Sequence, residues 1–581
     1  MKQKHLPRLI AMVMAVALLF SGCALPFELP FELPWQSNSA LGDRCTIPYS
    51  EMEYSRPDVE GIKTRLAELT TLVEQAGSIG DVLKYDEEAS AMLENFSSMS
   101  SLAELKNYHD STDTFYEEEY RYCKEGGVEL SNALNKYNMA IVEGPFAEEY
   151  RKEVGDYVFK SIQNDLLLNS DSVEAFKKER SQINIDYNNT LSALTLTYEG
   201  QEYTMADIEN LYYTDGYDTY IKLLTLYYKT NAETFTNFYR QMIELDKQTS
   251  YELGFASTAE MYYLSYSRDY TPEDAKTIAE NCKAIFVPIA GQINAQSFST
   301  DKISLARAMK TMPDSLAKIS PELESAWQHM VTYGLYDYAP AENKQTGIAF
   351  TTEIPSYDAP FCYGSWDDSF SSATTMIHEF GHYYDNWLRY DTSVVFNLDI
   401  AEIYSQGLEV LMQENFADFT NNPDSARAQN LQDFTNPLTF QVMLEDFQQQ
   451  VYALDTFDAD VIARLYATLL EEYGLQDYGL ADENGCDYSW FRITHLFDAP
   501  FYTISYTTSA LVALQIWAAS QDDWQTGVDM YLNLIHADQN QPFIQLVEGA
   551  GFADPTSADT MQTIAGHLAD TFGVQAGAAA A

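Results

Sequence analysis

Basic residues are scarce in this chain. Its 581 residues include 34 lysines and arginines against 87 aspartates and glutamates, and the formal net charge is −53. Nucleic-acid binding depends on lysine and arginine contacts to phosphates, so the composition argues against nucleic acid as a partner. An acidic surface of this kind suits a soluble body that is repelled by an anionic membrane.

Cysteine is also rare, with six residues and no C-x-x-C pair. A zinc site built from cysteines is therefore not expected. Disulfides can form outside the cell, but the sequence does not say which cysteines would pair. Five of the six are scattered over the chain: Cys45, Cys123, Cys282, Cys362 and Cys486.

Long apolar runs are missing except at the start. Residues 9–20 are apolar but too few to span a bilayer comfortably. A basic beginning and the sequence Ser21-Gly22-Cys23 surround them, and together they resemble a bacterial lipoprotein signal. Residues 1–22 are then removed and Cys23 is lipidated, leaving a net charge of −56. We expect an exported protein, lipid-anchored in the bacterial cell membrane and facing outward. The alternative is a plain secretory signal with a chance cysteine.

Residues 23–45 follow as a tether. The unit Pro-Phe-Glu-Leu occurs twice there, and proline-rich spacing of this kind makes a semi-extended linker. We place a helical N-terminal region at 46–205 and a catalytic region at 206–575. The sequence contains no repeat of solenoid period.

Histidine is rare too, yet two of the eight stand in His378-Glu379-Phe380-Gly381-His382. Histidines four residues apart lie on one face of a helix, so both imidazoles can bind one zinc ion. Glu379 lies one residue further round, where it can act as a base on water and does not bind the metal. The alternative is a surface helix that carries two histidines by chance.

A third ligand is expected about twenty residues later. Glu402 and Glu409 are seven residues apart in a segment that reads as a helix, so they share a face. Glu402 can give the zinc a carboxylate oxygen. Glu409 can hydrogen-bond a ligand histidine and fix its tautomer. Both could equally be solvated acids on a helix surface.

Near the C-terminus, one of the few histidines is found close to two tyrosines. His495, Tyr502 and Tyr506 could donate hydrogen bonds to the oxyanion formed during peptide hydrolysis. On a helix, the two tyrosines would share a face. Aromatic core packing is the alternative.

The remaining pattern is mostly helical. Helices are expected within 57–76, within 102–122, and from a Thr271-Pro272 start to Ile293. Residues 193–205 and 347–366 alternate like hairpins. The second hairpin precedes the zinc helix, and an exposed strand edge there could bind a peptide backbone.

These motifs together resemble the thimet oligopeptidase and oligoendopeptidase F family of zinc peptidases, most strongly over 340–520. The resemblance implies a mostly α, helical zincin-type fold with a deep substrate channel and a small β-sheet beside the zinc helix. It makes Glu402 the third ligand, puts Ser405 on the motif serine and Glu409 near the metal, and gives His495, Tyr502 and Tyr506 transition-state roles. The chain departs from the family at Thr494, where proline is common, and at Ser509, where glycine is common.

We therefore expect a metalloendopeptidase with one Zn²⁺ per chain that hydrolyses internal bonds of short peptides. Its membrane contact would be through the lipid anchor only, and the sequence gives no oligomeric state. Three alternatives remain: a metallocarboxypeptidase on a related fold, a surface lipoprotein that binds peptides without cutting them, and a structural zinc site. The last is disfavoured because structural sites usually have four protein ligands and favour cysteine.

Overall fold

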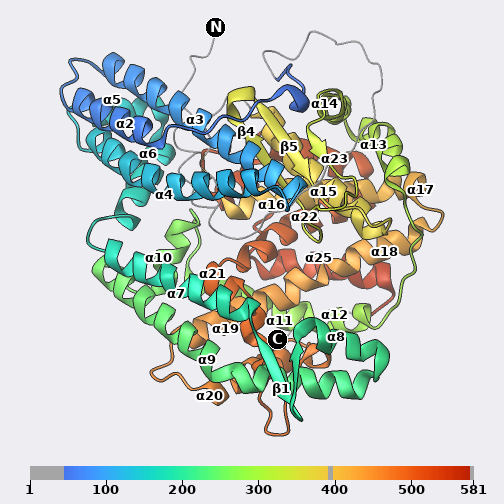
Figure 1. Ribbon diagram of the computed structural model, residues 1–581. Coiled ribbons are helices and arrows are strands. Elements are labelled where there is room, and N and C mark those ends of the chain that lie inside the picture. The colour runs from blue at the N-terminus through green and yellow to red at the C-terminus, as the bar shows by residue number, and fades with distance from the viewer. Residues whose placement is uncertain (1–44, 390–394, 396, 576–581) are drawn as a thin grey trace. The chain divides into compact units, whose positions relative to one another are not determined.

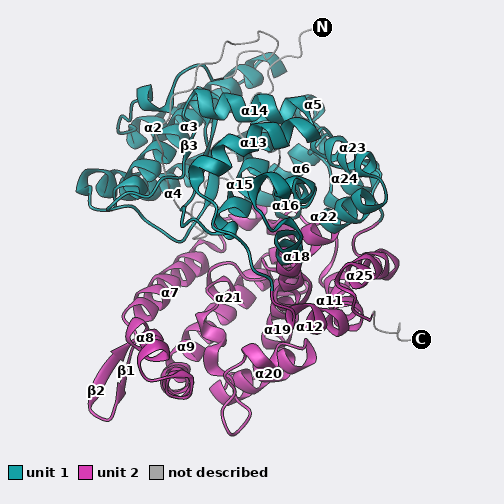
Figure 2. Cartoon of the chain, turned by 90° about the vertical axis from the view of Figure 1, so that its right-hand side faces the viewer, with its two compact units in different colours: residues 1–166, 298–431, 512–553 teal, residues 167–297, 432–511, 554–581 magenta. Residues whose placement is uncertain are grey.

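Helices make up 71% of the structure, with only short strands, as the sequence predicts. This computed structural model describes residues 45–389, 395 and 397–575. Cys23, the signal segment and the tether up to residue 44 lie outside the described residues. The chain forms two units, each made of three separate stretches (Figure 2).

Unit 1 comprises residues 1–166, 298–431 and 512–553. Its elements are η1 (Tyr49–Glu51), α2 (Val59–Glu74), α3 (Ile79–His109), α4 (Thr114–Val142), α5 (Ala147–Val154), α13 (Leu305–Ile319), α14 (Pro321–Thr332), β3 (Tyr336–Asp337), β4 (Phe350–Ile354), η2 (Pro355–Tyr357), β5 (Ala359–Tyr363), α15 (Phe370–Leu388), α16 (Leu398–Met412), η3 (Gln413–Asn415), α17 (Phe416–Phe419), α23 (Trp524–Ile535) and α24 (Phe543–Gly549).

Unit 2 comprises residues 167–297, 432–511 and 554–581. Its elements are α7 (Glu174–Ser192), β1 (Thr195–Tyr198), β2 (Gln201–Thr204), α8 (Met205–Thr214), α9 (Tyr217–Glu252), α10 (Thr258–Ser265), α11 (Pro272–Ile285), α12 (Val287–Asn294), η4 (Pro437–Gln441), α19 (Val442–Tyr452), α20 (Ala459–Glu472), η5 (Gln476–Tyr478), η6 (Tyr488–Arg492), α21 (His495–Asp498) and α25 (Ala558–Phe572). The chain passes between the units within α6 (Asp156–Leu168), α18 (Pro423–Asp433) and α22 (Ile504–Asp522).

The units do not follow the sequential division that we expect at residue 205. Each unit is assembled from stretches far apart in the chain, because helices bury their apolar stripes against whichever neighbours the tertiary fold provides. The division at 205 stays a prediction about the order of regions along the chain.

The N-terminal helices of unit 1 pack on one another. Helices α2, α3 and α4 are mutual neighbours (Figure 1), and their buried side chains form one apolar cluster that includes Leu66, Leu69, Phe96 and Leu134. Removing such side chains from water is the main stabilising contribution to a helical layer of this kind.

A small sheet lies beside the helix that carries the histidine pair. Its strand order is β3-β5-β4, with β5 parallel to β3 and antiparallel to β4. This confirms the hairpin expected within 347–366. The side chain of Thr351 faces α15, and Thr352 on the opposite face is 3.5 Å from the Ser101 hydroxyl of α3. The sheet therefore lies between α15 and α3.

The second expected hairpin, within 193–205, is also confirmed. Strands β1 and β2 pair through a two-residue turn at Glu199 and Gly200. Both turn residues have a positive φ, 52° for Glu199 and 83° for Gly200. A two-residue hairpin turn needs this backbone conformation because it matches the right-handed twist of the two strands.

Two of the expected helices are interrupted. Within 102–122 the chain leaves α3 at His109 and begins α4 at Thr114, because the Asp113 side chain accepts the first backbone N–H groups of α4. The run from Thr271 begins as expected with a cap and Pro272, and the cap is a capping box with Asp274, but the helix ends at Ile285. A new helix starts at Val287, since Pro288 has no N–H and its ring clashes with a preceding turn.

The five cysteines among the described residues are buried thiols and form no disulfide. In the part of the chain that the structure describes, each helix is too short or too polar to cross a membrane.

Candidate metal centre

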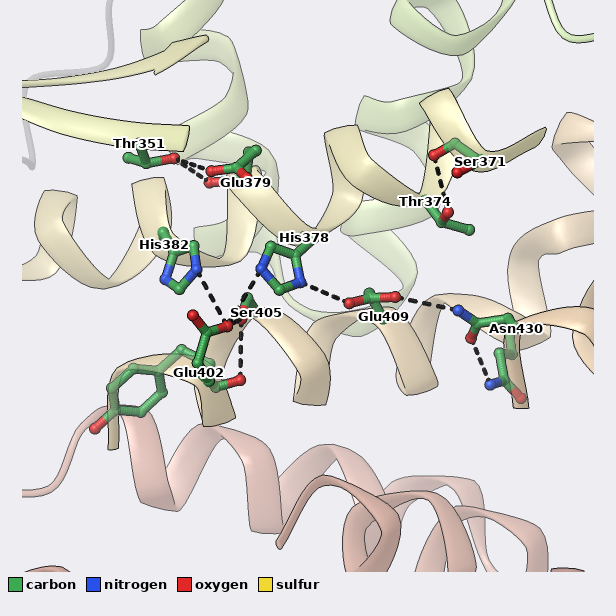
Figure 3. Close-up of polar contacts among 12 residues, drawn as sticks. Thr351, Ser371, Thr374, His378, Glu379, His382, Glu402, Ser405, Glu409 and Asn430 are labelled. Atoms are coloured by element: carbon green, nitrogen blue, oxygen red, sulfur yellow. Dashed lines mark hydrogen bonds and ion pairs between the residues drawn. The ribbon is translucent and has the colours of Figure 1, made fainter. Parts of the chain in front are cut away.

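Three side chains from two neighbouring helices converge in unit 1. His378 and His382 project from α15 toward Glu402 on α16 (Figure 3). One carboxylate oxygen of Glu402 lies 3.3 Å from Nε2 of His378 and 3.7 Å from Nε2 of His382. One candidate ligand atom from each residue lies within 4.8 Å of the other two. The two histidines four residues apart and the glutamate twenty residues after them thus lie together in the fold.

The two helices come this close because α15 has a glycine at the crossing point. A Cβ added to Gly381 would lie 2.5 Å from Cα of Ser405 and 2.7 Å from the carbonyl oxygen of Tyr404. Real side chains do not approach a backbone so closely, so only glycine permits this separation. Gly381 therefore sets the distance between the histidine pair and Glu402.

A chain of hydrogen bonds holds His378 from its other side (Figure 3). Nδ1 of His378 lies 2.7 Å from Oε1 of Glu409, and Oε2 of Glu409 accepts a hydrogen bond from Asn430 at 3.1 Å. Asn430 in turn accepts one from the Gln413 amide at 2.7 Å. With Nδ1–H donated to Glu409, Nε2 of His378 keeps its lone pair for a metal.

The Glu379 side chain lies beside the sheet. Its carboxylate accepts a hydrogen bond of 2.9 Å from the hydroxyl of Thr351 on β4 (Figure 3). The same hydroxyl is 2.8 Å from the backbone oxygen of Glu379. Only 5% of Glu379 is exposed to solvent, so the carboxyl group has few partners other than Thr351.

The electrostatics of this cluster follow from burial and from close charges. Burial raises the pKa of Glu379 to about 7, although His378 and the Thr351 hydrogen bond act in the opposite direction. Burial also raises the pKa of Glu402, but the hydrogen bond from His378 and the two imidazoles outweigh it and lower the pKa to about 2. Glu402 is thus ionised, while Glu379 can exchange a proton near neutral pH.

The two histidines respond differently to the same environment. Burial lowers the pKa of His382 to about 4, so this imidazole is neutral. Burial lowers the pKa of His378 as well, but the carboxylates of Glu402 and Glu409 overcome it and raise that pKa well above its usual value. A cation that binds here would replace the proton that His378 holds between two carboxylates.

The donor set fits a zinc ion. Two imidazoles and one carboxylate are the protein ligands of many catalytic zinc sites, in which one position stays open for substrate or water. Among the described residues, no fourth histidine, cysteine, aspartate or glutamate joins the group. A closed, four-ligand structural site is therefore not what these residues form.

His495, Tyr502 and Tyr506 come together in unit 2. Ring centroids are 5.5 Å apart for His495 and Tyr502, and 5.3 Å apart for the two tyrosines. Tyr502 precedes α22 and Tyr506 lies in its first turn, so the two tyrosines are not carried by one helix. Burial lowers the pKa of His495, which leaves a neutral imidazole with one N–H to donate.

Arginine and tyrosine side chains hold this aromatic segment in place. The Arg268 guanidinium donates to the backbone oxygen of Tyr502 at 3.3 Å and to the hydroxyl of Ser505 at 2.7 Å. The Tyr266 hydroxyl donates to the oxygen of Pro500 at 3.0 Å. Ser509, at the position where the family resemblance leads us to expect glycine, is buried within α22. The stretch after Pro500 is thus fixed by specific contacts and leads into α22, which begins at Ile504.

Sequence reasoning missed Thr351, Asn430 and Arg268. None belongs to a motif, and each reaches its partner from another element of the same unit. For Thr351 there was one usable signal, since it stands in the strand run just before the zinc helix. Asn430 and Arg268 carry no local signal, because only the packing of distant segments gives them their partners.

A helix that carries H-E-x-x-H and packs on a second helix with a facing carboxylate defines the metallopeptidase class of zincin type. Family comparison agrees with this class: residues 49–169 match the peptidase M3 N-terminal domain and residues 322–566 match peptidase family M3. The chain belongs to peptidase family M3. It is a peptidase.

Solved structures share the fold at low sequence identity. A crystal structure described as an oligoendopeptidase F has a TM-score of 0.77 at 20% identity, over 91% of this chain and 99% of that chain. An oligoendopeptidase F from Bacillus anthracis gives 0.74 at 19% identity, over 91% and 98%. A carboxypeptidase from Pyrococcus furiosus gives 0.55 at 11% identity, over 90% and 100%. No curated protein sequence matches the chain.

Proposed function

We propose that this peptidase is a zinc-dependent oligoendopeptidase that hydrolyses internal bonds of short peptides. The observation that carries the proposal is the convergence of His378, His382 and Glu402 within 4.8 Å, with the Glu379 carboxylate on the same helix. These three residues would hold one Zn²⁺ per chain. When bound, zinc supplies Lewis acidity, which polarises a carbonyl and lowers the pKa of water to near 7.

The residues of the chain have separate tasks in this scheme. Glu379 takes a proton from the attacking water and then delivers one to the leaving amine nitrogen. Its raised pKa, about 7, suits both steps at neutral pH. Glu409 keeps His378 in the tautomer that presents Nε2 to the metal. His495, Tyr502 and Tyr506 are proposed as donors to the oxyanion.

The first experiment is cleavage of a mixed peptide library by the wild type and by Glu379→Gln, each with its zinc content measured. Glutamine keeps the size of the side chain but cannot accept the proton. We expect the variant to retain zinc and to lose peptide cleavage by a factor of at least roughly 10², the lower range for a general base. A variant that still cleaves a quenched peptide at the wild-type rate would disprove the role of Glu379.

The same library separates endopeptidase from carboxypeptidase action. The carboxypeptidase reading has support from the fold likeness to the Pyrococcus furiosus enzyme. Peptides blocked by a C-terminal amide are cut by an endopeptidase and resist an enzyme that must bind a free terminal carboxylate. We expect amidated and free peptides to be cut at the same internal bonds. Cleavage confined to the last bond of unblocked peptides would favour the carboxypeptidase.

We further propose that the protein is exported and anchored to the bacterial cell membrane through a lipid on Cys23. The support is the signal-like segment ending in Ser21-Gly22-Cys23. Expression of Cys23→Ser in a bacterial host should move the protein from the membrane fraction to a soluble one. An unchanged distribution between the fractions would exclude the lipid anchor.

A further inference from the structure

Helix α7 of unit 2 is largely exposed and has a polar inner face. Tyr187 is the single buried residue among its 19. Arg180, Asn184 and Asn188 are half-buried and follow one another at intervals of four residues, so they lie on the same face of the helix as Tyr187. A helix that buries so little apolar surface depends on the hydrogen bonds of its inner face.

That inner face binds residues 491–498, which we call the His495 segment. The Tyr187 hydroxyl donates to the backbone oxygen of Phe491 at 3.1 Å. Its ring stacks on that of Phe497, with the centroids 3.9 Å apart. The Arg180 guanidinium donates to the backbone oxygen of Phe497 at 2.9 Å. Helix α7 thus holds the His495 segment at both of its ends.

Arg180 is itself fixed by a buried acid on α9. Its Nε donates to Oδ1 of Asp246 at 2.6 Å, and Oδ2 of Asp246 accepts from the Tyr452 hydroxyl at 3.0 Å. Asp246 is 2% exposed, so removal of Arg180 would leave a buried carboxylate without its cation. This pair therefore contributes to folding, and it is a poor place to test a role in the reaction.

The turn that carries His495 is held through Asp498. Helix α21 has only four residues, and one helical turn is too short to be stable without outside contacts. Asp498 is three residues after His495, so the two side chains are neighbours on this turn. Oδ1 of Asp498 accepts hydrogen bonds from Asn184 at 2.8 Å and from Asn188 at 3.3 Å. Asn188 also donates to Oδ1 of Asn184 at 2.8 Å, which orients the Asn184 amide.

The imidazole of His495 lies on the open side of this turn. His495 is half-buried, whereas the next two residues, Leu496 and Phe497, are buried. The ring centroid of His495 is 5.5 Å from that of Tyr502 and 6.4 Å from that of Tyr506. Any rotation of α21 would therefore move the imidazole relative to the two tyrosines.

We infer that α7 positions His495 for catalysis, and that the hydrogen bond from Asn184 to Asp498 is the contact through which it does so. Asn184 and Asp498 are positioning residues, since they act through the imidazole. Displacement of a reacting group by about 1 Å can lower a rate by roughly 10²-fold. This inference rests on the proposed function, in which His495 donates to the oxyanion.

Kinetics of Asn184→Ala test the inference, with Asn189→Ala as the matched control. Alanine removes the amide and favours a helix. Asn189 has the same side chain on the exposed face of the same helix. We expect Asn184→Ala to lower kcat roughly 5- to 50-fold with KM nearly unchanged, because an oxyanion donor acts mainly on the transition state. Asn189→Ala should keep the kcat of the wild type.

The same substitution in a His495→Ala background separates positioning from a general structural role. If Asn184 acts through the imidazole, the double variant should have the kcat of His495→Ala alone. A structural defect would instead lower kcat by the same factor in both backgrounds. That result, or a wild-type kcat for Asn184→Ala, would overturn the inference.

Hydrogen–deuterium exchange gives a readout that does not depend on activity. In Asn184→Ala, the amides of the fragment that covers residues 494–499 should exchange faster than in the wild type, because the α21 turn has lost an anchor. Asn189→Ala should exchange like the wild type. Unchanged exchange of that fragment in Asn184→Ala would count against the inference as firmly as unchanged kcat.

Failure of this inference is distinguishable from failure of the proposed function. If the wild type cuts internal peptide bonds and Glu379→Gln does not, the proposed function stands whatever Asn184→Ala does. A His495→Ala variant with the kcat of the wild type would remove the oxyanion role of His495, and the inference with it. If the wild type cuts no peptide while it contains zinc, the proposed function itself falls.

Discussion

At the level of residues, the geometry of the candidate metal centre depends on one carboxylate oxygen. Oε2 of Glu402 lies between the two imidazoles, 3.3 and 3.7 Å from their Nε2 atoms. Ser405 donates to the same oxygen at 3.2 Å, which reduces the freedom of the carboxylate to turn away. Glu409 and Asn430 do the same for His378. Glu402 and His378 are thus held by other side chains of the protein, independently of a cation.

Asp86 is a buried carboxyl group outside the candidate metal centre, and its burial leads to a prediction about stability. It is 0% exposed within α3 and accepts a hydrogen bond of 2.8 Å from the hydroxyl of Tyr150. Burial raises its pKa to about 7, and the hydrogen bond from Tyr150 and the nearby Tyr137 hydroxyl only partly oppose this. Because the folded-state pKa is above the usual value of 3.8, the stability from this group is greatest below about pH 4. It is lost as the pH rises from about 4 to about 7.

We therefore expect Asp86→Asn to stabilise the protein increasingly with pH. The gain should be small near pH 4.5 and should reach on the order of 2–4 kcal/mol at pH 8, since each pKa unit corresponds to about 1.4 kcal/mol. Urea unfolding at both pH values measures it. The exposed neighbour Glu87→Gln serves as a control and should change stability by less than about 0.5 kcal/mol. An asparagine variant less stable than the wild type at pH 8 would contradict the buried-charge argument.

At the level of elements, the close contact between α15 and α16 depends on one glycine at the point where the two helices cross. A methyl group at residue 381 would meet the Ser405 backbone at 2.5 Å, and backbone cannot rotate aside as a side chain can. We expect Gly381→Ala to separate the helices, to cost about 1–3 kcal/mol of stability, and to weaken zinc binding. Thermal unfolding and competition with a chromophoric chelator measure the two effects.

Gly566→Ala is the matched control for this substitution. Gly566 also lies inside a helix, α25, but a Cβ there would meet nothing within 4 Å. Alanine has the better helix propensity, so this variant should be as stable as the wild type or up to about 1 kcal/mol more stable. If Gly381→Ala bound zinc as tightly as the wild type, the glycine would not be setting the helix separation.

At the scale of the whole molecule, each unit depends on segments that are distant in sequence. Helices α15 and α16, which carry the candidate metal centre, belong to unit 1, which also contains the apolar cluster of α2, α3 and α4. This burial does not require a metal ion, unlike the small domains whose folding depends on zinc. We therefore expect the protein to stay folded when the metal ion is removed.

Metal removal tests this separation. We expect dialysis against a strong chelator to abolish peptide cleavage while far-UV circular dichroism keeps its helical signal, and added Zn²⁺ to restore activity. At a zinc concentration about 1,000 times Kd, the folded state should gain about 4 kcal/mol, seen as a higher Tm. Loss of helical signal on chelation would show that the metal holds the fold itself.

A structural feature could be predicted from the sequence where it depends on residues that are close together in the chain. The pairing of His378 with His382 follows from helix geometry within five residues, and the cap at Thr271 follows from its own next three residues. Interruptions after His109 and before Val287 were missed, since apolar spacing continues on both sides of them. Glu402 was proposed through family resemblance, because helical periodicity does not reach across a gap of twenty residues.

Residue types and local spacing were enough to predict a histidine pair with a glutamate beside it, a helical majority and an acidic surface. Each of these is a property of residue types or of spacing within one element, and local physics suffices for it. The hydroxyl that contacts Glu379, the amide that contacts Glu409 and the glycine that lets α15 approach α16 become known only from the packing of the folded chain. Those partners lie on different elements, and the packing of the chain, which depends on all its residues together, brings them within hydrogen-bond distance.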